Sequence, residues 1–163
     1  MNKKLNYILL ILTLNFSCVE KKSTEGETNK SELEATSKTD TLKFTSGIRS
    51  IFQDSKGNYW FGSIQEGVAV YNGNSFTYFS TNEGLKDNQI LAIQEDKNGI
   101  IWFESQNGLS SYDRKSIQDE TREITENSKV EWMKSDNDLW FASGIKEGVY
   151  RYDGRALNYL AFP

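Results

Sequence analysis

One short sequence motif is repeated three times in this chain. A tryptophan recurs at Trp60, Trp102 and Trp140, at intervals of 42 and 38 residues. A glycine and then a tyrosine follow each tryptophan at similar distances: Gly67 and Tyr71, Gly108 and Tyr112, and Gly148 and Tyr152. An internal period near 40 residues is typical of four-stranded propeller blades, which bury their faces only against neighbouring copies. The repeat therefore constrains the fold more than any other feature of the sequence.

Each copy reads as a series of short strands. An apolar, β-branched run opens each copy at 48–54, 90–96 and 130–136, and an aspartate ends it. Glycine and asparagine then supply a tight turn. Adjacent large aromatics in the next strand point to opposite faces of a sheet, so both faces must be covered. The turn residues are Asp54 and Gly57, Asp96 and Gly99, and Asp136, whose copy lacks the glycine.

These signals predict an all-β, propeller-like domain over residues 41–163. We expect three four-stranded antiparallel blades at about 48–80, 90–125 and 130–161, forming a propeller that is incomplete or completed by oligomerisation. Residues 114–128 are almost wholly polar, and we place the outer strand of the second blade at 122–125. Residues 41–45 resemble an outer strand without a blade of its own, which suggests strand exchange.

The N-terminal region is typical of an exported protein. Lys3 and Lys4 precede an apolar run over 5–16, which is too short to span a bilayer as a helix. Cys18 follows directly, and this arrangement resembles a bacterial lipoprotein signal over 1–18 with Cys18 as the lipidation site. We expect attachment to a bacterial membrane, with the outer membrane favoured. The alternative is a secreted or periplasmic protein that is cut elsewhere and loses Cys18. Residues 19–40 hold few apolar side chains and predict a disordered tether.

Composition excludes several kinds of chemistry. The chain has no histidine and a single cysteine, which excludes Ser–His–Asp and Cys–His catalysis and His/Cys zinc sites. We expect no metal and no cofactor. A formal net charge of −4 without a basic stripe argues against nucleic-acid binding. Paired carboxylates for glycoside hydrolysis remain an open alternative, although aspartates that recur in every copy are explained by the turn they make.

The repeated units resemble the two-component regulator propeller repeat. The matching stretches run from Asn88 to Phe103 with 108–113, and from Asp54 to Tyr71. The resemblance implies a propeller of the kind found in extracytoplasmic sensor halves of hybrid histidine kinases, which are associated with polysaccharide breakdown products. Those propellers have seven blades, whereas this sequence has three copies and no kinase, so the resemblance does not carry signalling over to it. The Asp-x-x-Gly-x-x-Trp hairpin is also similar to the Asp-box of sialidases, where it is a structural turn.

Three blades are fewer than the four to eight with which propellers typically close. The two end blades would each leave an apolar face open, and such faces usually mark an interface or an aggregation liability. We therefore expect self-association into six blades, or docking onto another propeller-containing protein. The alternative is that the chain is a truncated remnant of a larger propeller sensor.

Binding residues should lie where the copies differ, in loops at one rim of the blades. Their amide and charged groups suit hydroxyl-rich ligands such as oligosaccharides. Trp132 replaces Ser50 and Ala92 of the other copies and either stacks on a ligand or fills space, with filling favoured. The predicted function is a non-catalytic, membrane-anchored binding module, and the alternative is a carbohydrate hydrolase or lyase. The candidate rim residues are Gln65, Glu66, Gln106, Asn107, Lys146 and Glu147.

Overall fold

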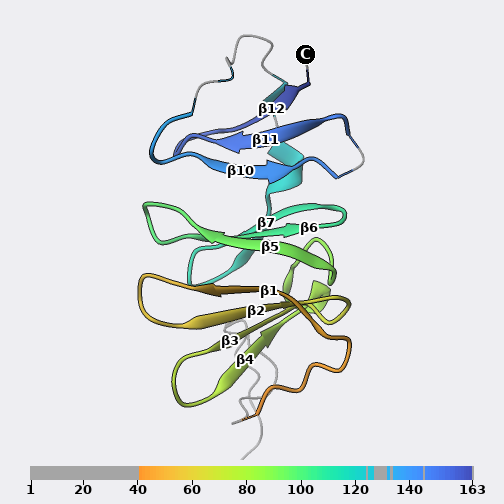
Figure 1. Cartoon of the computed structure of the whole chain (residues 1–163), viewed down its shortest axis with the longest axis vertical. Helices are drawn as coiled ribbons and strands as arrows, with labels where there is room; N and C mark the ends of the chain where they lie inside the picture. The colour runs from red at the N-terminus through yellow and green to blue at the C-terminus, as the bar shows by residue number, and fades with distance from the viewer. Residues whose placement is uncertain (1–40, 124, 127–131, 133, 145, 163) are drawn as a thin grey trace, which may run out of the picture. The chain divides into compact units, whose positions relative to one another are not determined.

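The computed structural model describes residues 41–162, apart from 124, 127–131, 133 and 145. The predicted signal, Cys18 and the tether lie outside these residues. The described strands form three four-stranded sheets that follow one another along the chain (Figure 1). This confirms the all-β prediction of three successive blades. No helix among the described residues is long and apolar enough to cross a membrane.

The first two sheets have the same construction. Each strand pairs antiparallel with the next in sequence, so the chain crosses the sheet from one edge to the other. A short 3-10 turn, η1 (Thr81–Glu83), lies between the two sheets. The strands of the first sheet are β1 (Ile48–Gln53), β2 (Tyr59–Ser63), β3 (Val68–Tyr71) and β4 (Phe76–Phe79), and those of the second are β5 (Ile90–Glu95), β6 (Ile101–Ser105), β7 (Gly108–Tyr112) and β8 (Ile117–Asp119).

The third sheet differs from the expected blade. Its strands are β10 (Leu139–Ala142), β11 (Gly148–Tyr152) and β12 (Leu157–Ala161), and its fourth strand, β9 (Thr125–Glu126), pairs parallel with β12 at the outer edge. The expected first strand over 130–136 is wrong in its described part, because Trp132 and 134–136 lie outside any strand. The remaining residues of that segment are not described.

Side chains of the second sheet bond the edge of β10 at which no strand is described. The amide of Gln94 donates to the carbonyl of Trp140 at 3.0 Å, and the carboxylate of Glu104 accepts from the backbone N–H of Ala142. Desolvation by burial raises the pKa of Glu104, although the Ala142 bond opposes that shift. Backbone groups that lack a ladder partner are thus satisfied by a neighbouring blade.

The outer strand of the second blade is β8, so its expected position at 122–125 is wrong. Ile117 lies opposite Tyr112 in the register and is buried. Ile117 joins this edge strand to the buried cluster between the first two blades. Residues 120–123 form the 3-10 turn η2, and Thr125 belongs to the third sheet.

Residues 41–45 do not form a strand, so the expectation that this segment is an outer strand is wrong. The hydroxyl of Tyr78 accepts from the Lys43 N–H at 2.8 Å and donates to the Thr41 carbonyl at 3.0 Å. The carboxylate of Glu66 accepts from the N–H groups of Thr45 and Ser46 at 2.9 and 2.7 Å. This segment is therefore held to the first blade by side chains instead of a ladder.

Each blade has a leading face, turned to the preceding blade, and a trailing face, turned to the following one. The trailing face of the first blade carries Trp60, whose ring lies 5.6 Å from Phe103 and 5.9 Å from Tyr112, centroid to centroid, on the leading face of the second. This contact is the centre of one buried cluster: Trp60, Val68, Phe79, Leu85, Ile90, Ile93, Ile101, Phe103 and Ile117.

The second contact repeats the first. Trp102 on the trailing face of the second blade lies 5.6 Å from Phe141 and 4.5 Å from Tyr152 on the leading face of the third. Trp60 and Trp102 are 1% and 3% exposed, respectively. Burying a large aromatic surface gives each of these contacts most of its free energy.

The turn aspartate of the first blade joins the turn to the tryptophan. Asp54 accepts from the backbone N–H of Asn58 at 2.8 Å and from the indole N–H of Trp60 at 2.8 Å. Desolvation by burial raises the pKa of Asp54, but hydrogen bonds from Trp60, Asn58 and Arg114 outweigh it and hold the pKa well below its usual range. The carboxylate is thus ionised and fully engaged.

In the third blade, Asp138 instead of Asp136 engages the turn, and Asp136 is exposed. Asp138 accepts from the Ser135 N–H at 2.7 Å and from Arg151 at 2.9 Å. Asp136 lies four residues before its tryptophan, whereas Asp54 and Asp96 lie six residues before theirs. Because the turn is two residues shorter, the carboxylate nearer to the tryptophan strand satisfies it.

Arg114 clamps the first two blades together. Its guanidinium donates to Asp54 of the first blade at 2.7 Å and to Glu95 of the second at 2.9 Å, and it lies over the Trp60 ring at 5.9 Å. Arg114 has a φ of 74°, at a turn position where the other copies have Gly73 and Gly154 with φ of 91° and 89°. The positive φ strains the backbone at Arg114, because a side chain is unfavourable in this conformation. The same side chain makes the ion pairs that join the two blades.

Two substitutions separate the clamp from the strain. We expect Arg114→Gly to lower the free energy of unfolding by about 2 kcal/mol, because Asp54 loses a buried charge partner but keeps its other donors. Arg114→Ala should cost about 1 kcal/mol more, because alanine keeps the unfavourable φ. Urea denaturation measures both values, with the exposed neighbour variant Lys115→Ala as control. An Arg114→Gly protein as stable as the wild type would show that the clamp contributes nothing.

Candidate functional site

The rim loops at one end of the blades are closed by a serine that recurs in each copy. The hydroxyl of Ser63 donates to the Gly67 carbonyl at 3.0 Å, and Ser105 donates to Gly108 at 2.7 Å. Ser143 donates likewise to Gly148 at 2.8 Å. This bond fixes the loop between the tryptophan strand and the following strand in all three blades, so that loop residues project from a defined base.

A pocket of about 170 Å³ lies between the loops of the second and third blades. The β6–β7 loop, the β10–β11 loop and η2 supply its walls. It brings together three of the predicted rim residues from two blades. The lining residues are Gln106, Asn107, Gly108, Thr121, Ser143, Lys146 and Tyr150.

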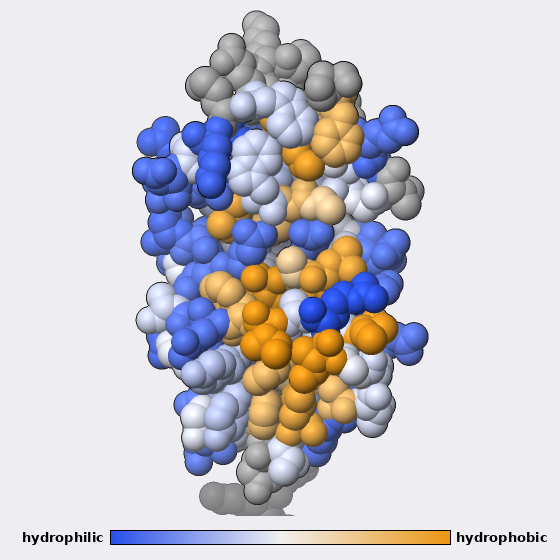
Figure 2. All heavy atoms as spheres, viewed as in Figure 1, coloured by the Kyte–Doolittle hydropathy of each residue, from blue (hydrophilic) through white to orange (hydrophobic). Residues whose placement is uncertain are grey.

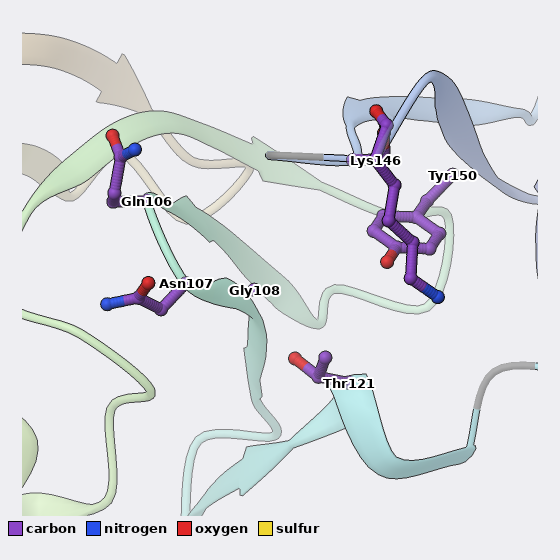
Figure 3. A pocket seen from close by; sticks show the side chains of 7 residues that line it. Gln106, Asn107, Gly108, Thr121, Lys146 and Tyr150 are labelled. Carbon is purple, nitrogen blue, oxygen red and sulfur yellow. The ribbon is translucent and has the colours of Figure 1, made fainter.

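Tyr150 and Lys146 face Thr121 across this pocket (Figure 3). The Tyr150 ring is 4% exposed and belongs to the core between the second and third blades. Desolvation by burial, with Tyr159 nearby, raises the pKa of Tyr150, so its hydroxyl stays protonated and able to donate at neutral pH. The ammonium of Lys146 lies 5.1 Å from the centre of the Tyr159 ring. The pocket thus combines a hydroxyl donor, a cation and aromatic surface.

Asn107 lies at the border of the pocket and not at its centre, although its position in the repeat makes it a candidate binding residue. Its amide points away from Tyr150 (Figure 3) and donates to the carboxylate of Asp87. Gln106 lies at the outer margin of the pocket and is exposed. The two amides therefore border the pocket, whereas Tyr150, Lys146 and Thr121 form its centre.

Close packing fixes the base of the pocket. A methyl group on Gly108, whose φ is 138°, would lie 2.1 Å from the Thr121 hydroxyl. That hydroxyl accepts from the Leu109 N–H at 3.0 Å. Gly108 is therefore required for close packing as well as for the turn. Its lack of a side chain allows η2 to pack against the rim loop.

The remaining candidates lie elsewhere or have other partners. Gln65 is exposed on the loop of the first blade and does not line the pocket. Glu66 is engaged with residues 45 and 46, and hydrogen bonds from Ser46, followed by those from Thr45, lower its pKa to about 2. Glu147 is exposed, and its carbonyl accepts from the Tyr159 hydroxyl at 2.9 Å. Trp132 lies against Trp140, outside the pocket.

Two central residues of the pocket were not among the predicted ones. Tyr150 lies within β11, and the alternation of side chains along a strand does not indicate that its hydroxyl reaches the rim. Thr121 lies in the polar segment 114–128, one residue before the outer strand that the sequence predicts at 122–125. No group of three or more metal-ligating side chains occurs within the described part of the chain.

A family model supports the resemblance drawn from the repeats. The model described as "Two component regulator propeller" matches residues 43–65 and 84–103, which are the hairpins of the first two blades. No functionally curated protein sequence shows significant similarity to the chain.

Solved structures share the fold at low identity. The extracellular domain of a protein described as the hybrid two-component system BT3049 from B. thetaiotaomicron is 23% identical, with a TM-score of 0.54 over 70% of this chain and 17% of that one. The extracellular domain of BT4673 from the same organism is 23% identical, with a TM-score of 0.51 over 66% of this chain and 16% of that one. Virginiamycin B lyase from Staphylococcus aureus is 15% identical, with a TM-score of 0.56 over 78% of this chain and 45% of the lyase.

The chain thus spans less than a fifth of the two sensor domains and under half of the lyase. At these identities the likeness establishes the fold alone. The three tryptophan-centred blades thus have a propeller-like fold, and the hairpins of the first two are similar to the two-component regulator propeller repeat.

Proposed function

We propose that this protein is a non-catalytic extracytoplasmic binding module that recognises a hydroxyl-rich ligand, an oligosaccharide, at the pocket between its second and third blades. The observation that carries the proposal is the convergence of Tyr150, Lys146 and Thr121 at one rim. We further propose that lipidation of Cys18 anchors the module to a membrane. The similarity to extracellular sensor domains supports the extracytoplasmic placement.

The chemistry of the pocket suits a sugar. A protonated phenol and an ammonium donate hydrogen bonds, and bordering amides both donate and accept them. The Tyr159 ring lies outside the pocket lining and packs against the Lys146 ammonium, which helps to position this cation beside the pocket. These groups come from two blades joined by a buried aromatic cluster, so the rigid scaffold positions them before a ligand arrives.

The pocket is small and open, which limits what it holds. Sites that enclose a drug-sized ligand measure roughly 300 Å³ or more. A pocket of about 170 Å³ accommodates one unit of a longer chain while the remainder extends along the rim. Recognition of oligosaccharides fits this geometry better than capture of a small metabolite.

The hydrogen bonds of the turn aspartates favour binding without catalysis. Asp54 and Asp138, the buried turn carboxylates of the first and third blades, are engaged by indole, guanidinium or backbone donors. Asp96 accepts from the N–H groups of Asn98 and Ile100 at 2.8 and 3.0 Å. Groups committed in this way stabilise turns and are poorly placed to move protons. The alternative, a carbohydrate hydrolase or lyase, is tested by looking for cleavage of any glycan that binds.

The pocket proposal predicts that Tyr150→Phe weakens binding of the best ligand in a panel of neutral and acidic oligosaccharides by about tenfold, since it removes one hydrogen-bond donor. Lys146→Ala should weaken it by a similar factor. Isothermal titration calorimetry gives the dissociation constants, and Lys56→Ala, an exposed lysine in the β1–β2 turn, is the matched control. Unchanged affinity in both pocket variants would place the ligand elsewhere, and product formation would favour the enzyme alternative.

The anchor proposal predicts a change of fractionation. In a bacterial host that processes lipoproteins, the wild-type chain should sediment with membranes and incorporate labelled palmitate. Cys18→Ser removes the only thiol and should abolish the label and release the protein from membranes. A wild-type chain that remains soluble and unlabelled would contradict lipidation.

A further inference from the structure

The large apolar side chains that remain exposed in the described part of the chain lie at its two end blades. Ile48, Ile51 and Tyr59 belong to the first blade and are 41%, 66% and 44% exposed. Trp132 and Phe162 lie against the third blade and are 49% and 58% exposed. The second blade, covered on both sides, has no member in this set. Exposed apolar surface therefore coincides with the faces that have no described blade beside them.

The leading face of the first blade is built for contact with another sheet. Ile51 corresponds in the repeat to Ile93, which is 6% exposed, and Tyr59 corresponds to Ile101, which is 0% exposed. The buried counterparts lie beneath the trailing face of the preceding blade. The first blade thus presents the type of surface that the second uses to receive Trp60.

Aromatic rings continue this leading face across the sheet. Ile51 lies opposite Phe61 in the register, and Tyr71 lies opposite both Tyr59 and Phe76. The Phe76 ring contacts Phe61 at 6.0 Å and Tyr71 at 4.8 Å, centroid to centroid. Directly opposed residues share one face of a sheet, so these side chains form a continuous apolar surface.

The trailing face of the third blade is the counterpart of this surface. Trp140 corresponds to Trp60 and Trp102 but is only half-buried. Trp132 stacks on it at 6.1 Å, and Phe162 stacks on Trp132 at 5.9 Å. The third blade therefore presents a tryptophan with no blade described beyond it.

An arginine–aspartate pair lies beside Trp140 as one lies beside Trp60, but its arginine comes from the same blade as the tryptophan. In the contact between the first two blades, Arg114 lies over Trp60 and pairs with Asp54. In the third blade, Arg151 lies 5.7 Å from the Trp140 ring and pairs with Asp138 at 2.9 Å. In the internal contact the incoming blade supplies the arginine, whereas Arg151 is neutralised by Asp138 within the third blade.

We propose that two copies of this chain close into a six-bladed ring, in which the trailing face of each third blade packs on the leading face of the other copy's first blade. The two contacts are equivalent by a two-fold axis, so the assembly is closed. Six blades lie within the range in which propellers close. This proposal does not depend on the ligand pocket.

The contacts between successive blades predict which residues meet between two copies. Trp60 packs on Phe103 and Tyr112, and Trp102 packs on Phe141 and Tyr152. The equivalent residues of the first blade are Phe61 and Tyr71. Trp140 of one copy should therefore pack on Phe61 and Tyr71 of a second copy.

A ring explains the exposed surface better than a face-to-face pair. Two first blades packed on each other would cover Ile51 and Tyr59 but leave Trp132 and Phe162 in water. Apolar surface also gathers over the first two sheets, around β1 and β5 (Figure 2). These are the innermost strands of their blades, and a closed ring turns such strands towards its axis. A head-to-tail contact covers both kinds of end face, and the two-copy ring is its closed form.

Complementary substitutions on the two faces test the ring. The full chain carrying Cys18→Ser, which excludes lipid and disulfide effects, should sediment as a dimer. Ile51→Asp and Phe162→Lys should each raise the dimer dissociation constant at least about tenfold, because each places a charge in both apolar contacts. An equimolar mixture of the two variants should recover dimer, because one contact of the mixed pair carries no substitution. Gln118→Lys, exposed on the second blade, is the control and should leave the dimer intact.

Other outcomes overturn the proposal. A wild-type monomer at all concentrations, or a dimer insensitive to both variants, would exclude these faces. Loss of dimer in Ile51→Asp alone would indicate face-to-face pairing of first blades. Growth beyond two copies would show that the contact does not close. Circular dichroism of each variant confirms that loss of dimer is not loss of fold.

Discussion

The structure depends on one constraint, which is that each sheet is apolar on both faces and must be covered on both. A tryptophan on each trailing face meets an aromatic pair on the next leading face, and the contact recurs between successive blades. A two-sided sheet cannot satisfy this need alone, so blades are stable only in series. The Asp54–Trp60–Arg114 group adds a polar clamp at the edge of the first contact, where a strained residue takes the place of glycine.

The architecture could be predicted because the features that create it are local. Adjacent aromatics at Trp60 and Phe61 require two covered faces, and the spacing of the copies sets the blade size. The exceptions occur where the pattern is weak. One isoleucine, Ile117, joins the outer strand of the second blade to the buried cluster from within a polar segment. The third blade has lost the glycine of its turn, and its fourth described strand is supplied by Thr125 and Glu126 at the opposite edge.

The candidate site was partly predictable for a similar reason. Loop residues such as Gln106 and Lys146 could be assigned to one rim from their place in the repeat. Whether two loops converge depends on the twist between neighbouring blades, which no local pattern encodes. Tyr150 reaches the pocket from within the core, and Glu66 is drawn away to hold residues 45 and 46. The repeat fixes the frame, whereas the site arises from the differences between its copies.

The central claim is that neighbouring sheets shield the tryptophans of the first two blades from water. Hydrogen exchange of the four indole N–H groups, followed by ¹⁵N-resolved NMR, tests it directly. The indole protons of Trp60 and Trp102, which donate to buried aspartates, should exchange far more slowly than that of Trp132, which is half exposed. Equal, rapid exchange at all four tryptophans in the folded protein would contradict the account.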